Sequence, residues 1–200
     1  MKTFYLKRGN AKLNKDTTLV WNLPAGATCG MTCPGCYAIK SQKMWPSVAK
    51  AWNKNLSLAE DASEFVSVID DELKHFQTTK TPPKFVRVHG SGDFFNQNYI
   101  NAWAYIAERN KDYTFYAYTV RLGDFDFSPL FELQNFVLHD STISGGKLNY
   151  GPMPAIQELA DEVGGFVCPY SKDRTGACGG TCIWCMEKKN EGTPILFEAH

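Results

Sequence analysis

Hydrophobic and polar positions alternate along the chain with two different periods, which predicts strands that alternate with helices. Short β-branched and aromatic runs followed by turns predict strands at 17–23, 84–89, 113–120, 136–142, 165–170 and 193–200. Apolar residues at helical spacing predict helices at 37–55, with an interruption at Pro46, and around 62–76, 99–107 and 156–163. Alternation of this kind predicts an α/β fold with parallel strands joined by crossovers.

The start of the second long helix has a local sequence signal. Ser57 and Glu60 have the spacing of a capping box, in which each side chain bonds a backbone N–H of the first turn. The apolar stripe that follows, from Ala62 to Phe76, is interpreted as core.

Two loops with unusual composition follow the first two predicted strands. The cysteine-rich loop "TCGMTCPGCYA" (28–38) follows the first strand, and the turn "GSGD" (90–93) follows the second. In parallel α/β folds the binding residues gather at the carboxyl ends of the strands. The two loops are therefore expected to share one site.

Composition narrows the class of protein. A chain of 200 residues is expected to form a single domain, 1–200, and 21 basic residues balanced by 21 acidic ones argue against a dedicated polyanion binder. A basic N-terminal stretch is the exception, and it is interpreted as a solvated face or a phosphate-contacting arm: Lys2, Lys7, Arg8, Lys12 and Lys15.

The seven cysteines predict metal binding more readily than disulfides. No apolar run approaches the roughly 18 residues that span a bilayer, and the N-terminus lacks the apolar core of a signal peptide. A cytoplasmic protein without membrane partners is therefore expected, in which thiols stay reduced. An odd number of cysteines also fits a disulfide framework poorly.

The first cysteine set, Cys29, Cys33 and Cys36, has the spacing C-x3-C-x2-C and lacks a local fourth ligand. A structural zinc site is closed by four ligands, and His89 or His139 could supply the fourth from a strand end. The alternative is a [4Fe–4S] cluster held by three thiolates, with one iron open to a small molecule.

This spacing, in a loop after the first strand of an alternating β/α chain, resembles the radical S-adenosylmethionine superfamily. The resemblance implies that S-adenosylmethionine binds the open iron and is cleaved reductively to methionine and a 5′-deoxyadenosyl radical, which abstracts hydrogen from a substrate. It further implies a compact partial (β/α)6 TIM-like barrel with a C-terminal cysteine-rich, cluster-binding loop, and a reductant partner such as flavodoxin or ferredoxin.

The glycine-rich turn supports the same resemblance. Members of the superfamily carry a Gly-Gly-Glu-like turn after the second strand that holds the cofactor's ammonium, and the turn here consists of Gly90, Ser91, Gly92 and Asp93. Many members also have an aromatic residue before the third cysteine. Here Gly35 stands in that place and Tyr37 follows the cysteine, so Tyr37 is counted among the cofactor-binding candidates.

The second cysteine set, Cys168, Cys178, Cys182 and Cys185, has four members within a segment, 165–190, and can close a metal site by itself. It is interpreted either as a structural zinc knuckle or as an auxiliary [4Fe–4S] cluster. "CPGCYA", "CGGTCIWC" and "TPILFEAH" together resemble the small phage-type gene product 88 family.

Substrate-side candidates follow the third and fourth strands. Arg121 is expected to pair a carboxylate of the cofactor or substrate, and Asp140 and Ser141 lie where pocket residues gather. Arg121 and Ser141 are counted among the cofactor-binding candidates. The substrate class stays open among peptides, nucleotides, RNA and metabolites. Two other functions are compatible with the same cysteines: a zinc-holding, nucleic-acid-binding module and a two-cluster electron carrier.

Overall fold

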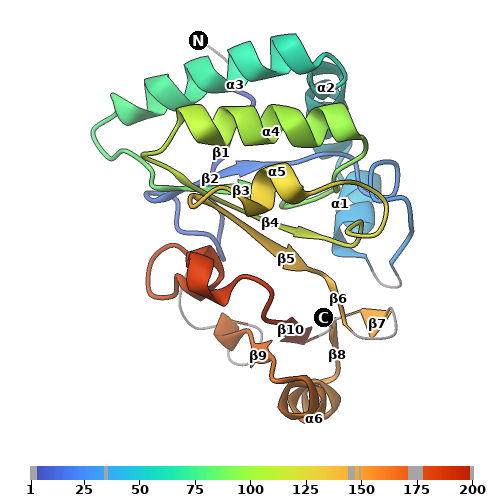
Figure 1. The fold of residues 1–200 in the computed structure, drawn as a ribbon. Helices are drawn as coiled ribbons and strands as arrows, with labels where there is room; N and C mark the ends of the chain where they lie inside the picture. Colours follow the sequence, from blue (N-terminus) through green and yellow to red (C-terminus); the bar gives the residue numbers. More distant parts are fainter. Residues whose placement is uncertain (1–3, 34–35, 144–146, 149, 171–177, 199–200) are drawn as a thin grey trace.

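The computed structural model describes residues 4–33, 36–143, 147–148, 150–170 and 178–198. Its main sheet has the order β1-β2-β3-β4-β5 (Figure 1). The strands are β1 (Lys7–Arg8), β2 (Thr18–Trp21), β3 (Phe85–Val88), β4 (Thr114–Thr119) and β5 (Phe136–Asp140). Strands β2 to β5 pair in parallel and lie side by side in chain order, while β1 is antiparallel to β2. The predicted parallel α/β arrangement is confirmed for these four strands.

Helices cover one face of this sheet (Figure 1). They are α2 (Pro46–Ala59), α3 (Ala62–Gln77), α4 (Gln97–Arg109) and α5 (Ser128–Phe131), while α1 (Tyr37–Met44) lies beside the ends of the strands and packs against α2. Between helices and sheet lies the main core, where Trp21, Trp103 and Phe115 are fully buried. Apolar burial of this size is the main stabilising term for such a layer. The interruption predicted at Pro46 is confirmed, because α2 begins there.

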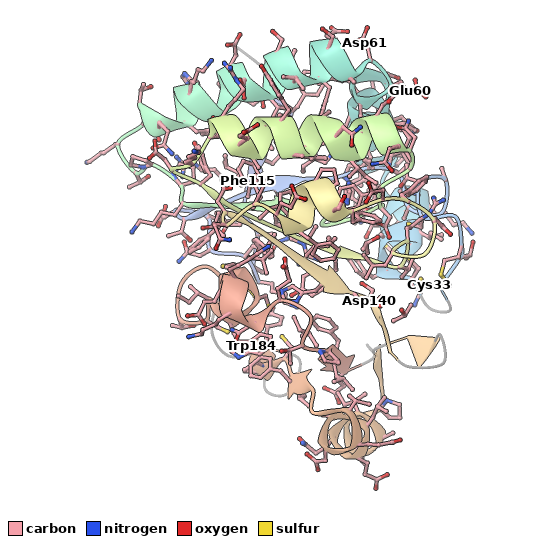
Figure 2. All side chains as sticks on the ribbon, viewed as in Figure 1. Cys33, Glu60, Asp61, Phe115, Asp140 and Trp184 are labelled. Atoms are coloured by element: carbon pink, nitrogen blue, oxygen red, sulfur yellow. The ribbon has the colours of Figure 1, made fainter. Side chains whose placement is uncertain are left out.

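The start of α3 differs from the predicted capping box. Asp61 is the N-cap residue, and its Oδ1 accepts hydrogen bonds from Ser63 N at 2.9 Å and Glu64 N at 3.0 Å (Figure 2). Ser57 lies inside α2 instead. The predicted capping box was wrong because Asp61, four residues after Ser57, is an equally good cap and satisfies two N–H groups.

The C-terminal third covers the opposite face of the sheet (Figure 1). It contains a hairpin of β6 (Thr142–Ile143) and β7 (Lys147–Leu148), then β8 (Tyr150–Gly151), α6 (Met153–Val163), β9 (Phe166–Val167), the 3₁₀ helices η1 (Trp184–Met186) and η2 (Lys188–Asn190), and β10 (Ile195–Glu198). Strands β8, β10 and β9 form a separate three-stranded sheet. The strands predicted fifth and sixth therefore do not continue the main sheet, and the described strands form no closed barrel.

Charged side chains of the C-terminal third form hydrogen bonds with the backbone of the edge strand β5. Glu191 Oε1 accepts a hydrogen bond from Leu138 N at 2.9 Å, and Lys188 Nζ donates to Phe136 O at 2.9 Å. Lys188 and Glu191 also form an ion pair of 2.7 Å. These contacts satisfy backbone groups that an open sheet edge would leave unpaired. No helix of the described residues has the length and hydropathy needed to cross a membrane.

Candidate functional site

The first cysteine set lies in the loop that leaves β2 at its carboxyl end. Cys36 is the N-cap residue of α1, while Cys29 and Cys33 precede it in the same loop. Burial raises the pKa of the Cys29 and Cys33 thiols, and the nearby charge of Asp93 raises both further. These thiols are therefore protonated at neutral pH, and a metal must displace their protons on binding.

The 90–93 turn is tied to the end of β2. Ser91 Oγ donates to Leu23 O at 2.9 Å, and Leu23 N donates to Ser91 O at 2.9 Å. Gly92 has φ +80°, and a Cβ there would lie 2.6 Å from Leu23 Cβ and 2.7 Å from Thr28 Oγ1. Only glycine fits this conformation and this close approach. The turn and the cysteine loop are thus packed together, as the sequence predicted.

The buried Asp93 holds the 90–93 turn in place through hydrogen bonds. Its Oδ1 accepts from Phe94 N at 2.7 Å and its Oδ2 from Val120 N at 2.9 Å, while its own N–H donates to Thr28 Oγ1 at 3.0 Å. The residue is 4% exposed. The Asp93 carboxylate, which was expected to bind the ammonium of the cofactor, therefore joins the turn to the end of β4.

Arg121 lies against the first cysteine loop. Its Nη1 donates to Thr28 O at 3.0 Å, and a Cβ on Gly30 would lie 3.0 Å from its Cζ. Its Nε pairs with Asp124 at 2.6 Å. The structure places this guanidinium at the predicted site, with part of its charge already offset by Asp124.

Tyr37 connects the cysteine loop to the turn by a side-chain contact. Its hydroxyl donates a hydrogen bond to Gly90 O, and the side chain is otherwise exposed. The aromatic residue that follows Cys36 is thus held over the 90–93 turn. Gly35 lies outside the described residues.

Asp140 and Ser141, at the carboxyl end of β5, form hydrogen bonds with neighbouring residues of the chain. Asp140 Oδ1 accepts hydrogen bonds from Thr142 N at 2.8 Å and Thr142 Oγ1 at 2.7 Å. Ser141 N donates to Thr119 O at 2.7 Å. Neither residue is joined to the first cysteine set by a hydrogen bond within the described part of the chain.

The two candidate zinc histidines are engaged elsewhere. His89, in a left-handed backbone conformation with φ 62°, pairs its Nε2 with Tyr99 Oη at 2.9 Å. His139 Nε2 donates to Cys185 O at 2.9 Å, so it lies beside the second cysteine set. Burial lowers the pKa of His89 to about 3 and that of His139 to about 4, so both rings are neutral at pH 7.

The second cysteine set is assembled from the C-terminal segment and is bound to the N-terminal loop. Cys178 N donates to Lys12 O at 2.8 Å, and Gly179 O accepts from Thr17 Oγ1 at 2.6 Å. Cys168 directly follows β9, and its N–H donates to Leu196 O at 2.9 Å. Burial raises the pKa of Cys185 to about 11.

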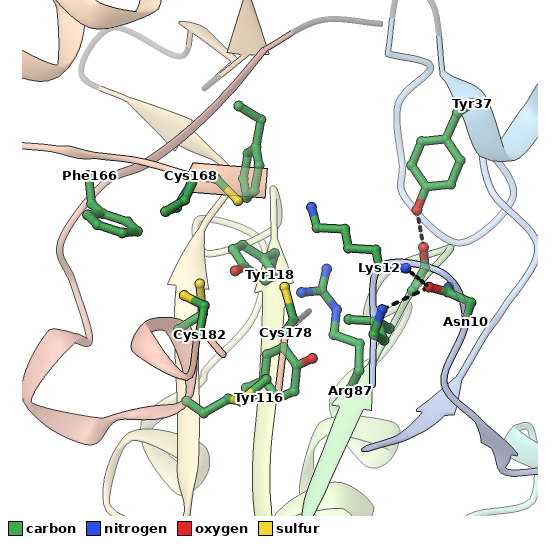
Figure 3. Close-up of a pocket in the computed structure, with 16 residues that line it drawn as sticks. Asn10, Lys12, Tyr37, Arg87, Tyr116, Tyr118, Phe166, Cys168, Cys178 and Cys182 are labelled. Carbon is green, nitrogen blue, oxygen red and sulfur yellow. Dashed lines mark hydrogen bonds between the residues drawn. The ribbon is translucent and has the colours of Figure 1, made fainter. Parts of the chain in front are cut away.

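A cavity of about 130 Å³ lies between the second cysteine set and the start of the 90–93 turn (Figure 3). Tyr37 and Gly90 line it on one side, and all four cysteines of the second set line it on the other. Two further lining residues, Arg87 and Lys12, were missed as site residues by the sequence analysis. The available signals were a charged residue inside the apolar strand run "KFVRVH" and the basic N-terminal stretch.

Thiol side chains are suitable ligands for zinc or an iron–sulfur cluster, but the positions of these cysteines do not make a complete set of metal ligands. Within the described ranges, no three or more His, Cys, Asp or Glu side chains are grouped so that they could hold a metal ion. The thiols are thus of the right chemical type for a metal group, but the described residues are not grouped as a complete ligand set.

The buried Asp93 predicts a specific pH dependence of stability. Burial raises its pKa from 3.8 to about 6, so the folded state binds the proton more tightly than the unfolded chain. The free energy of unfolding of the wild-type protein, relative to that of the Asp93→Asn variant, should fall by about 2–3 kcal/mol as the pH rises from about 4 to about 6. Above that pH the difference should stay constant. Urea unfolding of both proteins across this range measures the difference; parallel curves would contradict the assignment.

Comparison with known proteins identifies the family to which the chain belongs. The sequence model of a family described as "Gene product 88" matches residues 5–177. The "Gene 88 protein" of Mycobacterium phage L5 is 31% identical over 126 residues, covering 56% of this chain and 51% of that protein. The "Gene 88 protein" of Mycobacterium phage D29 is 32% identical over 126 residues, with the same coverage.

The chain spans about half the length of the curated relatives it matches. No solved structure matches it. The resemblance predicted from the cysteine motifs is confirmed at the level of this phage family. The matched names state no activity, so the radical S-adenosylmethionine interpretation stays a prediction.

Proposed function

We propose that this chain, which belongs to the gene product 88 family, is a radical S-adenosylmethionine enzyme whose first cysteine set holds a [4Fe–4S] cluster. Bound there, the cluster and S-adenosylmethionine would supply reductive cleavage to methionine and a 5′-deoxyadenosyl radical for hydrogen abstraction. One observation carries the proposal. The C-x3-C-x2-C loop and the 90–93 turn pack against each other at the carboxyl edge of a parallel sheet, joined by Tyr37 and Asp93.

The chain's own residues have separate tasks in this proposal. Cys29, Cys33 and Cys36 are the ligands, and the amino end of α1 beside Cys36 favours their negative charge. Tyr37 and the 90–93 turn border the cofactor. Arg121, whose guanidinium already reaches Thr28 O, is the candidate partner of the cofactor carboxylate.

Asp93 takes a different part from the one expected from sequence. Both of its oxygens accept backbone N–H groups, so we assign it to holding the turn in shape. Each carboxylate oxygen has further lone pairs, but burial restricts access to them. A role in binding the cofactor's ammonium would then rest on backbone carbonyls of the turn.

The proposal includes a partial barrel. The neighbouring parallel strands β2, β3, β4 and β5 follow chain order, as they do in a (β/α) barrel. The C-terminal third covers the face that would be the interior, and we interpret it as the closure of a barrel shortened to this size. We expect the enzyme to work in the cytoplasm, with a flavodoxin- or ferredoxin-type reductant.

The second cysteine set is proposed to hold an auxiliary [4Fe–4S] cluster. All four of its thiols line the cavity that also reaches Tyr37 and Gly90, which suits a group near the substrate. A structural zinc ion is the second candidate. The observation that favours zinc is the attachment of Cys178 and Gly179 to the N-terminal loop, since a closed four-thiolate site stabilises such a junction.

The decisive experiment is anaerobic reconstitution of the whole chain followed by counting of iron, sulfide and zinc. Dithionite and S-adenosylmethionine are then added, and 5′-deoxyadenosine is measured by chromatography. We expect iron and sulfide at the first set and formation of 5′-deoxyadenosine. Zinc without iron would contradict the enzyme and favour a zinc-binding module; clusters without cleavage would favour an electron carrier.

A further inference from the structure

Among the described residues, the cavity beside the second cysteine set is lined by basic side chains but by no acidic ones. Among the described residues that line it, Arg87 and Lys12 are cationic and none is Asp or Glu. The remaining lining residues are apolar, aromatic, amide or thiol side chains and Gly90. No ion pair to either cation is formed within the described ranges. A partly buried cation without a carboxylate partner is costly unless an anion compensates it.

Arg87 is held in the cavity by the sheet itself. It lies in the central strand β3, and its neighbours Val86 and Val88 point into the helix-covered core, so its side chain projects from the opposite face. Its Nε donates to His89 O at 3.2 Å, and its guanidinium lies 4.0 Å from the ring centroid of Tyr118. These contacts fix the side chain but do not neutralise it.

Lys12 approaches the same space from the N-terminal loop (Figure 3). Its Nζ lies 5.1 Å from the ring centroids of Tyr170 and Phe197. The hydroxyl of Tyr116, a third polar group on the cavity wall, is buried and has no hydrogen-bond partner among the described residues. Two cations and a hydroxyl group that line the same cavity form a recognition surface for oxyanions.

We propose that this cavity binds the anionic group of the enzyme's substrate, a carboxylate or a phosphate, through Arg87, Lys12 and the Tyr116 hydroxyl. A volume of about 130 Å³ holds one such group with a few further atoms. The rest of the molecule would extend past Tyr37 and Gly90 toward the first cysteine loop. The term "substrate" rests on the proposed function, whereas anion binding does not.

The test uses the anaerobically reconstituted full chain and two radiolabelled probes, inorganic phosphate and acetate, in equilibrium dialysis. We expect one of the probes to bind, and Arg87→Met to weaken that binding by at least about tenfold, as expected for loss of a charge-assisted hydrogen bond. Lys12→Met should weaken it several-fold. Lys50→Met removes a positive charge from an exposed position of α2, outside the cavity lining, and should leave binding unchanged.

Preference for phosphate or acetate would support the site and identify the anion. Lack of binding of both probes to the wild-type chain, or equal binding by the Lys12→Met and wild-type chains, would overturn it; the Lys12 variant keeps this test valid if Arg87→Met does not fold. The same dialysis is run on the chain before reconstitution: binding that is present there and lost after reconstitution would assign Arg87 to the thiolates and overturn the site too.

Cleavage of S-adenosylmethionine is measured on the same samples. Cleavage without anion binding overturns only the inference about the cavity. Anion binding without cleavage supports the cavity site and contradicts the proposed function.

Discussion

Replacement of Cys29 by alanine is expected to abolish reductive cleavage of S-adenosylmethionine. Two thiolates cannot hold the cluster that the three-cysteine loop is proposed to bind. The loss should exceed the roughly 10–100-fold that follows removal of an outer-shell partner of a metal site. The measurement is 5′-deoxyadenosine formed per reconstituted chain, together with iron content.

Cys178→Ala is the matched control, because it removes one thiol from the second cysteine set, which lies across the cavity from Tyr37. If that set is auxiliary, part of the cleavage should persist while iron content falls. Persistence of cleavage in Cys29→Ala, or complete loss in Cys178→Ala with the first cluster intact, would reverse the assignment of the two sets.

Gly92→Ala is expected to destabilise the protein by about 3 kcal/mol. The new Cβ would lie 2.6 Å from Leu23 Cβ and 2.9 Å from Leu23 O, on a backbone with φ +80°. Overpacking and left-handed strain each cost about 1–3 kcal/mol. Thermal unfolding should show a Tm lower by roughly 6–12 °C for a chain of this size.

The control for this variant is Gly123→Ala. No atom lies within 4 Å of a Cβ at Gly123, so stability should stay the same or rise slightly, since alanine restricts the unfolded chain. Equal stability of the Gly92 and Gly123 variants would show that the 90–93 turn can shift, and would remove the argument that its shape is fixed against Thr28.

Sequence patterns identified the elements whose signal is local. The run from Thr18 to Trp21 and the stripe from Ala62 to Gln77 form the predicted strand and helix, because periodicity reflects burial on one face. The capping box failed since several side chains near a helix start are competent caps and only the backbone conformation selects Asp61.

Positions of site residues were only partly accessible from sequence. The cysteine loop and the 90–93 turn could be placed together because the carboxyl ends of neighbouring parallel strands meet at one edge. Arg87 and Lys12 could not be joined in the same way. They are 75 positions apart in the chain, and no periodic pattern records which distant loop covers a sheet face.

The sequence by itself determined the α/β class, the parallel strands β2 to β5, the family and the two cysteine sets, because each depends on local periodicity or on short motifs. Tertiary structure alone decided that Asp93 faces inward, that β9 and β10 form a second sheet, and that Arg87 lies in a cavity without a carboxylate partner among the described residues. These outcomes depend on long-range packing and on the cost of burying charge, which no short stretch of sequence contains.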